Sequence, residues 1–364
     1  MKKLTRKGVR FKGLTLGLDV HKKFIEYCVL DKDGEEVAGG KVASRHKDLI
    51  ALLATLKKQG AVQACLEACG SFIWIFDVLA EVLGRDAVHV AQPNRIHVIA
   101  NSMEKNDAND AWWLAYLLYE QRLPESFVAE GSLRELRIAS RELRAYTDQR
   151  GDLLRRFKSH LAQAGLNVPK NWHASKIGRQ KARAVLAGIG GERGRALQAL
   201  RKQIARLGRQ LLYWRARIAE LAKAFKEIAV LQDQMPGFGL LLSSLALAEL
   251  GLPQRFYNQK AYAKATGLTP GYRESGGHQQ QTGITRHGSR HARWAFTRAV
   301  IACLRCKSGV GFQVRQWVEQ RARHKPKKKV VVAAARKLAE GVWRLFAMGE
   351  VFDLAQAFPV KCAA

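Results

Sequence analysis

The sequence lacks any long uncharged apolar run. No stretch reaches the roughly 18 consecutive residues that a membrane-spanning helix requires, which excludes a spanning segment. The opening residues, MKKLTRKGVRFKG, are basic but lack the apolar core of a secretory signal peptide. We therefore expect a cytoplasmic protein that has no part in the membrane.

Cysteine is also scarce, with six residues in 364. Cys65 and Cys69 are four apart, and Cys303 and Cys306 form one CxxC, but neither a second CxxC nor a pair of histidines accompanies them. The spacing alone leaves open a zinc site built from the two pairs. Because Cys65 lies in an apolar strand-like run and Cys303 in an apolar helix, we interpret these two as small buried hydrophobic residues.

Acidic residues are scarce relative to basic ones: 31 Asp and Glu face 62 Lys and Arg, which gives a formal net charge of +31. Residues 1–130 carry 18 basic and 17 acidic side chains, so nearly all of the excess belongs to residues 131–364. A field of this sign attracts polyanions. Since no apolar run supports binding to an anionic membrane, we expect the second part of the chain to hold nucleic acid.

A chain of this length suggests two or three domains. Residues 14–42 read as three short strands, with DKDG as a turn between the second and third. Alternating helices and strands follow, and their predicted ranges are 46–59 (helix), 61–68 (strand), 72–84 (helix), 87–93 (strand) and 93–119 (helix). This order is typical of an α/β domain of the RNase H-like class, which we place at 14–128.

The middle of the chain, 131–230, is helical and rich in arginine. Apolar residues alternate three and four apart along its second half: Leu197, Leu200, Ile204, Leu207, Leu211, Trp214, Ile218, Leu221, Phe225 and Ile228. Such a stripe is typical of a coiled coil. A weaker stripe over 133–161 could equally be the core face of a bundle, and the two helices could fold back as a hairpin or pair between subunits. A third, mainly helical domain is predicted at 231–350.

Four acidic residues of the first domain fall at the ends of predicted elements. Asp19 and Glu67 end strands, and Asp107 and Asp110 lie three apart near the start of the last helix, on one face. Each acid alone has a simpler explanation as a cap or a helix-dipole partner. In an RNase H-like sheet, however, all four would converge, and crowded carboxylates require cations. The hard oxygen ligands suit two Mg²⁺ or Mn²⁺ ions.

The segments GLDVHKKFIEYCVLD, EACG and KNDANDAWWLA resemble the RuvC-like domain of DEDD transposases, the prokaryotic insertion-sequence recombinases guided by a bridge RNA. The segments MPGFGLLLSSLALAELG and GLTPGYRESGGHQQQTGITRHGSRHARWAF resemble the transposase domain of the same family. The likeness covers both ends of the chain, and the helical middle corresponds to the coiled-coil connector of the family.

The resemblance implies the fold, the chemistry and the partners. It implies that Asp19, Glu67, Asp107 and Asp110 bind Mg²⁺ and that Ser275 is the nucleophile, which would hold a cut strand as a phosphoserine. It further implies double-stranded DNA as substrate, a guide RNA as partner, and a dimer or tetramer in which the two catalytic parts meet. Without the resemblance, ESGG would be read as a glycine-rich turn.

Further residues around the predicted serine could contact phosphate. Arg286, Arg290 and Arg293 form a basic run after Ser275 that ends on a helix, although a solvated basic face would explain each of them as well. The PGFG turn offers backbone N–H groups of Gly237 and Gly239 at the start of a helix, where a tight turn alone is the simpler explanation.

Two other functions are consistent with parts of this pattern. A Holliday-junction endonuclease of the RuvC type would use the four acids with water as the nucleophile, without Ser275. A non-enzymatic nucleic-acid architectural protein would need only the basic half of the chain. A covalent protein–DNA intermediate distinguishes the recombinase from the endonuclease, and metal-dependent strand cutting distinguishes both enzymes from the architectural protein.

Overall fold

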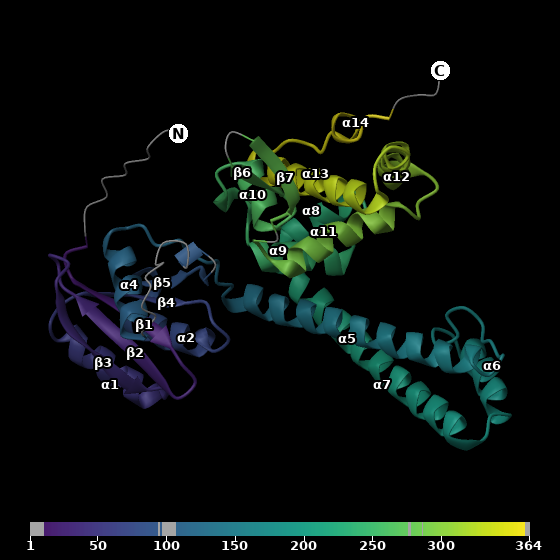
Figure 1. Cartoon of the computed structure of the whole chain (residues 1–364), viewed down its shortest axis with the longest axis horizontal. Coiled ribbons are helices and arrows are strands. Elements are labelled where there is room, and N and C mark those ends of the chain that lie inside the picture. Colours follow the sequence, from purple (N-terminus) through teal and green to yellow (C-terminus); the bar gives the residue numbers. More distant parts are fainter. Residues whose placement is uncertain (1–10, 94, 97–106, 276–277, 286, 361–364) are drawn as a thin grey trace. The chain divides into compact units, whose positions relative to one another are not determined.

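The computed structural model describes residues 11–93, 95–96, 107–275, 278–285 and 287–360 (Figure 1). The side chains of 107–108 and of 272–282 lie outside this description. The chain divides into two compact units, 1–128 and 129–364. Each unit has its own apolar core.

The first unit contains a five-stranded mixed sheet with helices on both faces. Its elements are β1 (Leu14–Val20), β2 (Phe24–Leu30), β3 (Glu36–Ala43), α1 (His46–Lys57), β4 (Val62–Glu67), α2 (Phe72–Leu83), the 3-10 turn η1 (Arg85–Ala87), β5 (Val88–Ala91) and α4 (Asp107–Tyr119). The strand order is β3-β2-β1-β4-β5. The strands and helices predicted over 14–91 are confirmed, as is the second half of the helix predicted at 93–119; its stretch 97–106 lies outside the described residues.

The period-two alternation of the strands divides the sheet into two faces. Leu16 and Leu18 of β1 pack in the core formed with α1 and α2. Gly17 of β1 and Cys28 of β2 lie on the opposite face, under α4, and Cys65 of β4 lies on that face too, because its Sγ donates a hydrogen bond to the carbonyl of a residue in α4. Every second residue of the central strands therefore faces α4.

Gly17 sets the distance between α4 and the sheet. A Cβ at this position would lie 2.1 Å from the carbonyl oxygen of Ala111 and 2.6 Å from the amide nitrogen of Ala115. Only a residue without a side chain allows the helix backbone to approach the central strand so closely. The two alanines are fully buried, so the helix lies directly on β1.

The second unit is mainly helical, as predicted for the C-terminal part of the chain. Its elements are α5 (Gly131–Ala162), α6 (Lys176–Ala187), α7 (Gly191–Ala222), α8 (Lys226–Gln234), α9 (Leu240–Leu250), η2 (Pro253–Arg255), α10 (Gln259–Ala265), β6 (Pro270–Ser275), β7 (His278–Ile284), α11 (Arg290–Cys303), α12 (Gly309–Ala322), α13 (Lys327–Ala347) and α14 (Leu354–Ala357). The two strands pair only with each other, as an antiparallel hairpin, among the residues that the structure describes.

Helices α5 and α7 form an antiparallel hairpin within the chain, with α6 at its tip (Figure 1). Near its base, Leu136 and Leu143 of α5 pack with Leu211 and Ile218 of α7. A separate cluster at the tip contains Phe157 together with residues of α6 and α7. The hairpin alternative is therefore the observed one. The predicted apolar stripe is interrupted, however, because α7 ends at Ala222 and the last two predicted positions belong to the start of α8.

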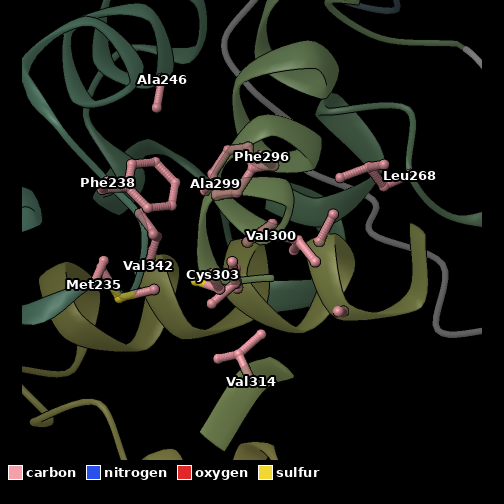
Figure 2. Packing of buried hydrophobic residues seen from close by; sticks show 14 of the residues in the cluster. Met235, Phe238, Ala246, Leu268, Phe296, Ala299, Val300, Cys303, Val314 and Val342 are labelled. Carbon is pink, nitrogen blue, oxygen red and sulfur yellow. The ribbon is translucent and has the colours of Figure 1, made fainter. Parts of the chain in front are cut away.

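The largest apolar cluster of the second unit is formed by residues of helices α8 to α13. Figure 2 shows Phe238 and Phe296 facing each other, and their ring centroids are 5.2 Å apart in an edge-to-face arrangement. Cys303 and Val342 lie nearby in the same cluster. This core holds α9 and α11 against each other. None of the helices in the described ranges is long and apolar enough to cross a membrane.

Candidate functional site

Asp19 and Glu67 lie at the carboxyl ends of two neighbouring parallel strands. Asp19 is the next-to-last residue of β1 and Glu67 is the last residue of β4. The register pairs Leu18 with Leu66, so the two acids follow at adjacent positions. Because Asp19 is two residues after Gly17, and Glu67 two after Cys65, both belong to the face covered by α4. The sheet thus brings these two predicted acids to the same edge and the same face.

Helix α4 carries Asp110 toward that edge. The helix runs antiparallel to β1: Tyr119, at its end, lies against the turn at Gly34, which follows the strand paired with the start of β1. The first turn of α4 must therefore lie near the end of β1. Asn109 and Trp112 line a cavity of about 440 Å³ together with Glu26, whose Cα is paired with that of Asp19. Asp107 is the first residue of α4, but its side chain lies outside the described atoms.

Two further groups belong to this edge, and sequence reasoning did not select them. His21 lies 2.9 Å from Asp19 through its Nε2 and the Oδ2 of the carboxylate, and the Asp19 side chain is 16% exposed. Glu26 is buried and forms an ion pair of 3.2 Å with Lys41. The sequence does contain a signal for Glu26: a charged residue stands at a position of β2 where alternation predicts a buried side chain. For His21 it contains none, because a single loop histidine is usually structural.

The donor set at this edge fits a hard divalent cation. Carboxylate oxygens from β1, β4 and α4 are the ligands that Mg²⁺ and Mn²⁺ prefer. Among the described side chains alone, no three acidic, histidine or cysteine groups are close enough together to hold an ion. Asp107 is the remaining member of the predicted set, and its carboxylate is not among those side chains.

Ser275 lies at the tip of the hairpin in the second unit. It is the last residue of β6, and its register partner is His278, the first residue of β7. The two intervening residues and the side chain of Ser275 lie outside the described atoms. The base of the hairpin closes through the amide of Thr285, which donates to the carbonyl of Thr269 at 2.9 Å. The backbone thus places Ser275 at the end of the two-stranded hairpin.

The start of α11 packs beside the base of this hairpin. Gly288 has no room for a side chain, because a Cβ there would lie 2.2 Å from the carbonyl oxygen of Ala265. Ser289 caps the helix by accepting hydrogen bonds from the first amides. Of the predicted phosphate-contacting residues, Arg290 is exposed on the first turn and Arg293 is half-buried, whereas Arg286 lies outside the described residues.

A buried carboxylate fixes this helix start to the helical hairpin. The Glu249 side chain is 3% exposed. It accepts two hydrogen bonds from Arg141, at 2.6 and 3.0 Å, and one from the hydroxyl of Ser289 at 2.8 Å. Burial by itself would raise the pKa of Glu249, but the hydrogen bonds and charge of Arg141 outweigh it and hold that pKa below its ordinary value. A network of charged and polar side chains therefore joins α5, α9 and the start of α11.

His291 extends this network toward the exposed surface. Its Nδ1 lies 2.9 Å from the guanidinium of Arg144, which also stacks over Trp294 at 4.8 Å. Burial, followed by the charges of the surrounding arginines, lowers the pKa of His291 from 6.5 to about 4, against the opposing effect of Glu249. The imidazole is thus neutral at pH 7, and its Nδ1 can accept a hydrogen bond from Arg144.

The two glycines of the PGFG turn differ in their surroundings. Gly237 has a φ of 75°, and a Cβ there would lie 2.2 Å from the carbonyl oxygen of Ala299. This glycine has a packing role against α11, and contact with phosphate stays a prediction for it. Gly239 caps α9, and nothing lies within 4 Å of where its Cβ would be. Its surroundings leave space for a ligand at the helix start.

The buried cysteines have packing roles, as predicted from their apolar context. Cys65 and Cys303 are fully buried. The Cys65 Sγ donates to the carbonyl of Leu114 at 3.0 Å. Burial raises the pKa of the Cys303 thiol to about 12 and raises that of Cys65 as well. Both thiols stay protonated at neutral pH and pack as small apolar side chains.

Comparison with known proteins finds relatives that are named as transposases. The chain is 28% identical over 149 residues to a protein named as a family 20 transposase from Pseudomonas aeruginosa strain PAO1; the match covers 41% of this chain and 42% of that protein. It is 29% identical over 124 residues to a protein named as transposase y4pF/y4sB from Sinorhizobium fredii strain NGR234, covering 34% and 32%. The chain thus spans less than half the length of the curated relatives it matches.

Two family models match separate parts of the chain. A model described as a transposase, of the DEDD type, matches residues 16–165 and so includes the edge with Asp19, Glu67 and Asp110; a domain of this type implies the use of a divalent metal. A second model, described as the transposase IS116/IS110/IS902 family, matches residues 230–313, which include Ser275 and the start of α11. The two models match residues 16–165 and 230–313, which contain the two candidate regions in the order expected along one polypeptide. These matches show that the chain belongs to the IS116/IS110/IS902 family of transposases.

Proposed function

We propose that this protein is a DNA recombinase that excises and inserts an insertion sequence by strand cleavage and exchange. The observation that carries the proposal is the position of Asp19, Glu67 and Asp110, all directed by strand alternation and helix direction to one edge and one face of a sheet. The strand order β3-β2-β1-β4-β5 supports an RNase H-like fold for this unit. The transposase family models support the reaction class.

Ser275 would supply the nucleophile. Its Oγ forms a bond to a backbone phosphorus while one ester bond of that phosphate breaks, and the departing strand oxygen takes up a proton. The other strand end is then held as a phosphoserine. Attack by a hydroxyl of a second strand reverses the step and frees the serine, so bonds are exchanged without an external energy source. The position of Ser275 at the tip of a hairpin supports access to a strand.

The acidic edge would hold Mg²⁺ or Mn²⁺, with Asp19, Glu67, Asp107 and Asp110 as ligands. A bound divalent ion would supply charge neutralisation at the phosphate. The protein groups around it have separate roles: His21 orients the carboxylate of Asp19 through their contact of 2.9 Å. Lys41 neutralises Glu26 and so limits the negative charge of the edge.

The partners follow from the charge distribution and the family. The excess of basic residues after residue 130 supports binding of double-stranded DNA and of a guide RNA. Arg290, exposed at the start of α11, would contact a phosphate of the bound strand. The acids and the serine belong to different units, and we propose that a dimer or tetramer brings them together.

The decisive experiment is a search for a covalent protein–DNA complex. The parent protein is incubated with its element ends, its guide RNA and Mg²⁺, and the products are resolved under denaturing conditions. We expect a complex that disappears in Ser275→Ala and persists in Thr285→Val, which removes a hydroxyl at the base of the same hairpin. Strand cutting that is unaffected by Ser275→Ala would instead support the RuvC-type endonuclease, with water as the nucleophile.

The acidic edge requires its own test. Asp110→Asn should abolish strand cutting while leaving DNA binding unchanged, because it removes one charge from the metal ligands without altering the basic half of the chain. Asp33→Asn, in the exposed turn between β2 and β3, is the matched control. If the parent protein itself cuts no strand in the presence of any divalent metal, the architectural alternative is the better description.

A further inference from the structure

The α5–α7 hairpin contains a cavity of about 360 Å³ near its tip that is lined by basic side chains. Four arginines line it, from three helices and therefore from distant parts of the sequence: Arg150 on α5, Arg179 on α6, and Arg201 and Arg209 on α7. His173 and Trp172, from the loop before α6, complete the polar part of the lining. Among the described residues, no acidic side chain contributes to it.

Carboxylates accompany some of the arginines on these helices but not those of the cavity, among the described residues. Other arginines of the same two helices form ion pairs one turn away, such as Arg155 with Asp152 and Arg217 with Glu220. None of the four lining arginines forms an ion pair with any residue in the described part of the chain. Burial, followed by the charge of Arg215, lowers the pKa of Arg150. Concentrated positive charge of this kind is unfavourable unless an anion neutralises it.

A second groove on the same helices provides an internal comparison. It has a volume of about 480 Å³ and lies between other residues of α5 and α7: Tyr146, Gln149, Asp152, Leu153, Gln203, Arg206, Leu207 and Gln210. This groove carries one arginine, Arg206, and one acid, Asp152, which is paired with Arg155, so its lining holds less positive charge than the four arginines of the cavity. The high arginine content of the helices is therefore not enough to explain a lining of four arginines without a carboxylate.

Gly208 gives an independent indication that the cavity is kept open. It lies in the interior of α7 and lines the cavity. Glycine within a helix costs about 1 kcal/mol relative to alanine, and here no packing contact explains it, because nothing lies within 4 Å of where a Cβ would be. Glycine without a packing reason is typical of a place where a ligand approaches the backbone.

Two residues of the cavity lining carry polar atoms that lack hydrogen-bond partners among the described residues. Trp172 is 3% exposed, and within the described ranges neither its Nε1 nor the Nδ1 of His173 has a hydrogen-bond partner. Burial, followed by the charges of Arg150 and Lys158, lowers the pKa of His173. The site thus combines guanidinium donors, an indole and a neutral imidazole, a set suited to a phosphate with an attached sugar or base.

We propose that this cavity binds one nucleotide unit of a nucleic-acid strand, with its phosphate on the arginines. A volume of about 360 Å³ is more than an isolated phosphate fills and is within the range of small-molecule sites. A strand is favoured over a free nucleotide because the positive charge continues beyond the lining: Lys158 and Arg215 act on His173 and Arg150 from outside it. The cavity contains none of the residues assigned to cutting and exchange.

The test measures strand binding without strand cutting. Full-length Ser275→Ala protein in EDTA is titrated with fluorescein-labelled single-stranded RNA and DNA oligonucleotides, and fluorescence anisotropy gives Kd at several salt concentrations. Gly208→Leu fills the cavity without changing the charge and is expected to raise Kd by about tenfold for the strand that the cavity binds. The replacement also removes a helix glycine, so it should not reduce helix stability.

A charge variant with a matched control keeps the test decisive if Gly208→Leu fails to fold. Arg201→Gln with Arg209→Gln should weaken binding and lower the slope of log K against log salt by about 0.7 for each phosphate that is no longer neutralised. Arg193→Gln with Arg206→Gln removes the same charge from α7 outside the cavity and should have little effect. The proposal would be overturned if both pairs of substitutions raised Kd equally. It would also be overturned if AMP competed for the parent protein while Gly208→Leu bound the strand with unchanged Kd, because the cavity would then bind a free nucleotide and not a strand.

Discussion

Gly17→Ala should loosen α4 from the sheet. The added Cβ would lie 2.1 Å from the carbonyl oxygen of Ala111, whereas ordinary contacts begin at 3.4 Å, so the helix must retreat by roughly 1 Å. The obstacle is backbone, which cannot rotate away as a side chain can. Overpacking of this kind costs about 1–3 kcal/mol. Removing glycine from a strand returns about 0.5–1 kcal/mol, so we expect the first unit to lose about 1 kcal/mol of stability.

Hydrogen exchange followed by mass spectrometry is the appropriate assay, because peptides from β1 and β4 report on the first unit alone. A loss of about 1 kcal/mol corresponds to roughly fivefold faster exchange of amides that exchange through unfolding. Gly188→Ala, at a position with open space around it, should leave these peptides unchanged. The same shift of roughly 1 Å displaces Asp110 relative to Asp19 and should reduce metal-dependent cutting by about 100-fold. Unchanged exchange in β1 and β4 would refute the close-packing argument.

Three further perturbations test the second unit. Glu249→Ala should destabilise it by about 1–3 kcal/mol, because Arg141 and Ser289 would lose the carboxylate that accepts their hydrogen bonds; urea denaturation measures the loss, and a loss below about 0.5 kcal/mol would contradict the network. Since the folded-state pKa of His291 is lowered from 6.5 to about 4, its contribution to stability is complete above pH 6.5 and is lost as pH falls toward 4. That loss should be on the order of 1–2 kcal/mol for a half-buried group, and His291→Gln should remove this part of the pH profile; an unaltered profile would be the contrary result. Gly237→Ala should lower the midpoint of thermal unfolding, because the Cβ would meet a carbonyl oxygen and the residue has a positive φ, whereas Gly239→Ala should change it little; equal midpoints would argue against the packing role.

The sheet of the first unit was predictable because its signals are local. Alternation, the turn at DKDG and the apolar runs define the strands, and the parallel pairing of β1 with β4 then places Asp19 beside Glu67. The direction of α4 relative to the sheet could not be predicted in the same way. It depends on the packing of Ala111 and Ala115 on Gly17, which are more than 90 positions apart in the sequence. Glu26 was missed because its Lys41 partner lies on another strand.

The second unit was harder to predict, because its polar contacts are between distant residues. Nothing in the spacing of Arg141, Glu249 and Ser289 indicates that they meet, since the pairs are separated by 108 and 40 positions. The apolar stripe of α7 predicted a long helix correctly but not its end at Ala222, because the residues that follow keep the same three-and-four spacing into α8. The basic cavity could not be predicted from the sequence either, because its four arginines come from three helices and are far apart along the chain.

The α5–α7 hairpin is held by two separate apolar clusters, one at its base and one at its tip, so its length can change without disturbing either cluster. The base cluster is closed by α9 and the tip cluster by α6, so the middle of the hairpin contributes spacing more than anchoring. Removing seven residues from each helix at matched positions would shorten the hairpin by about 10 Å and keep both apolar faces in register. The distance between the base and the tip of the hairpin can therefore differ from one relative to another while the packing of both clusters stays the same.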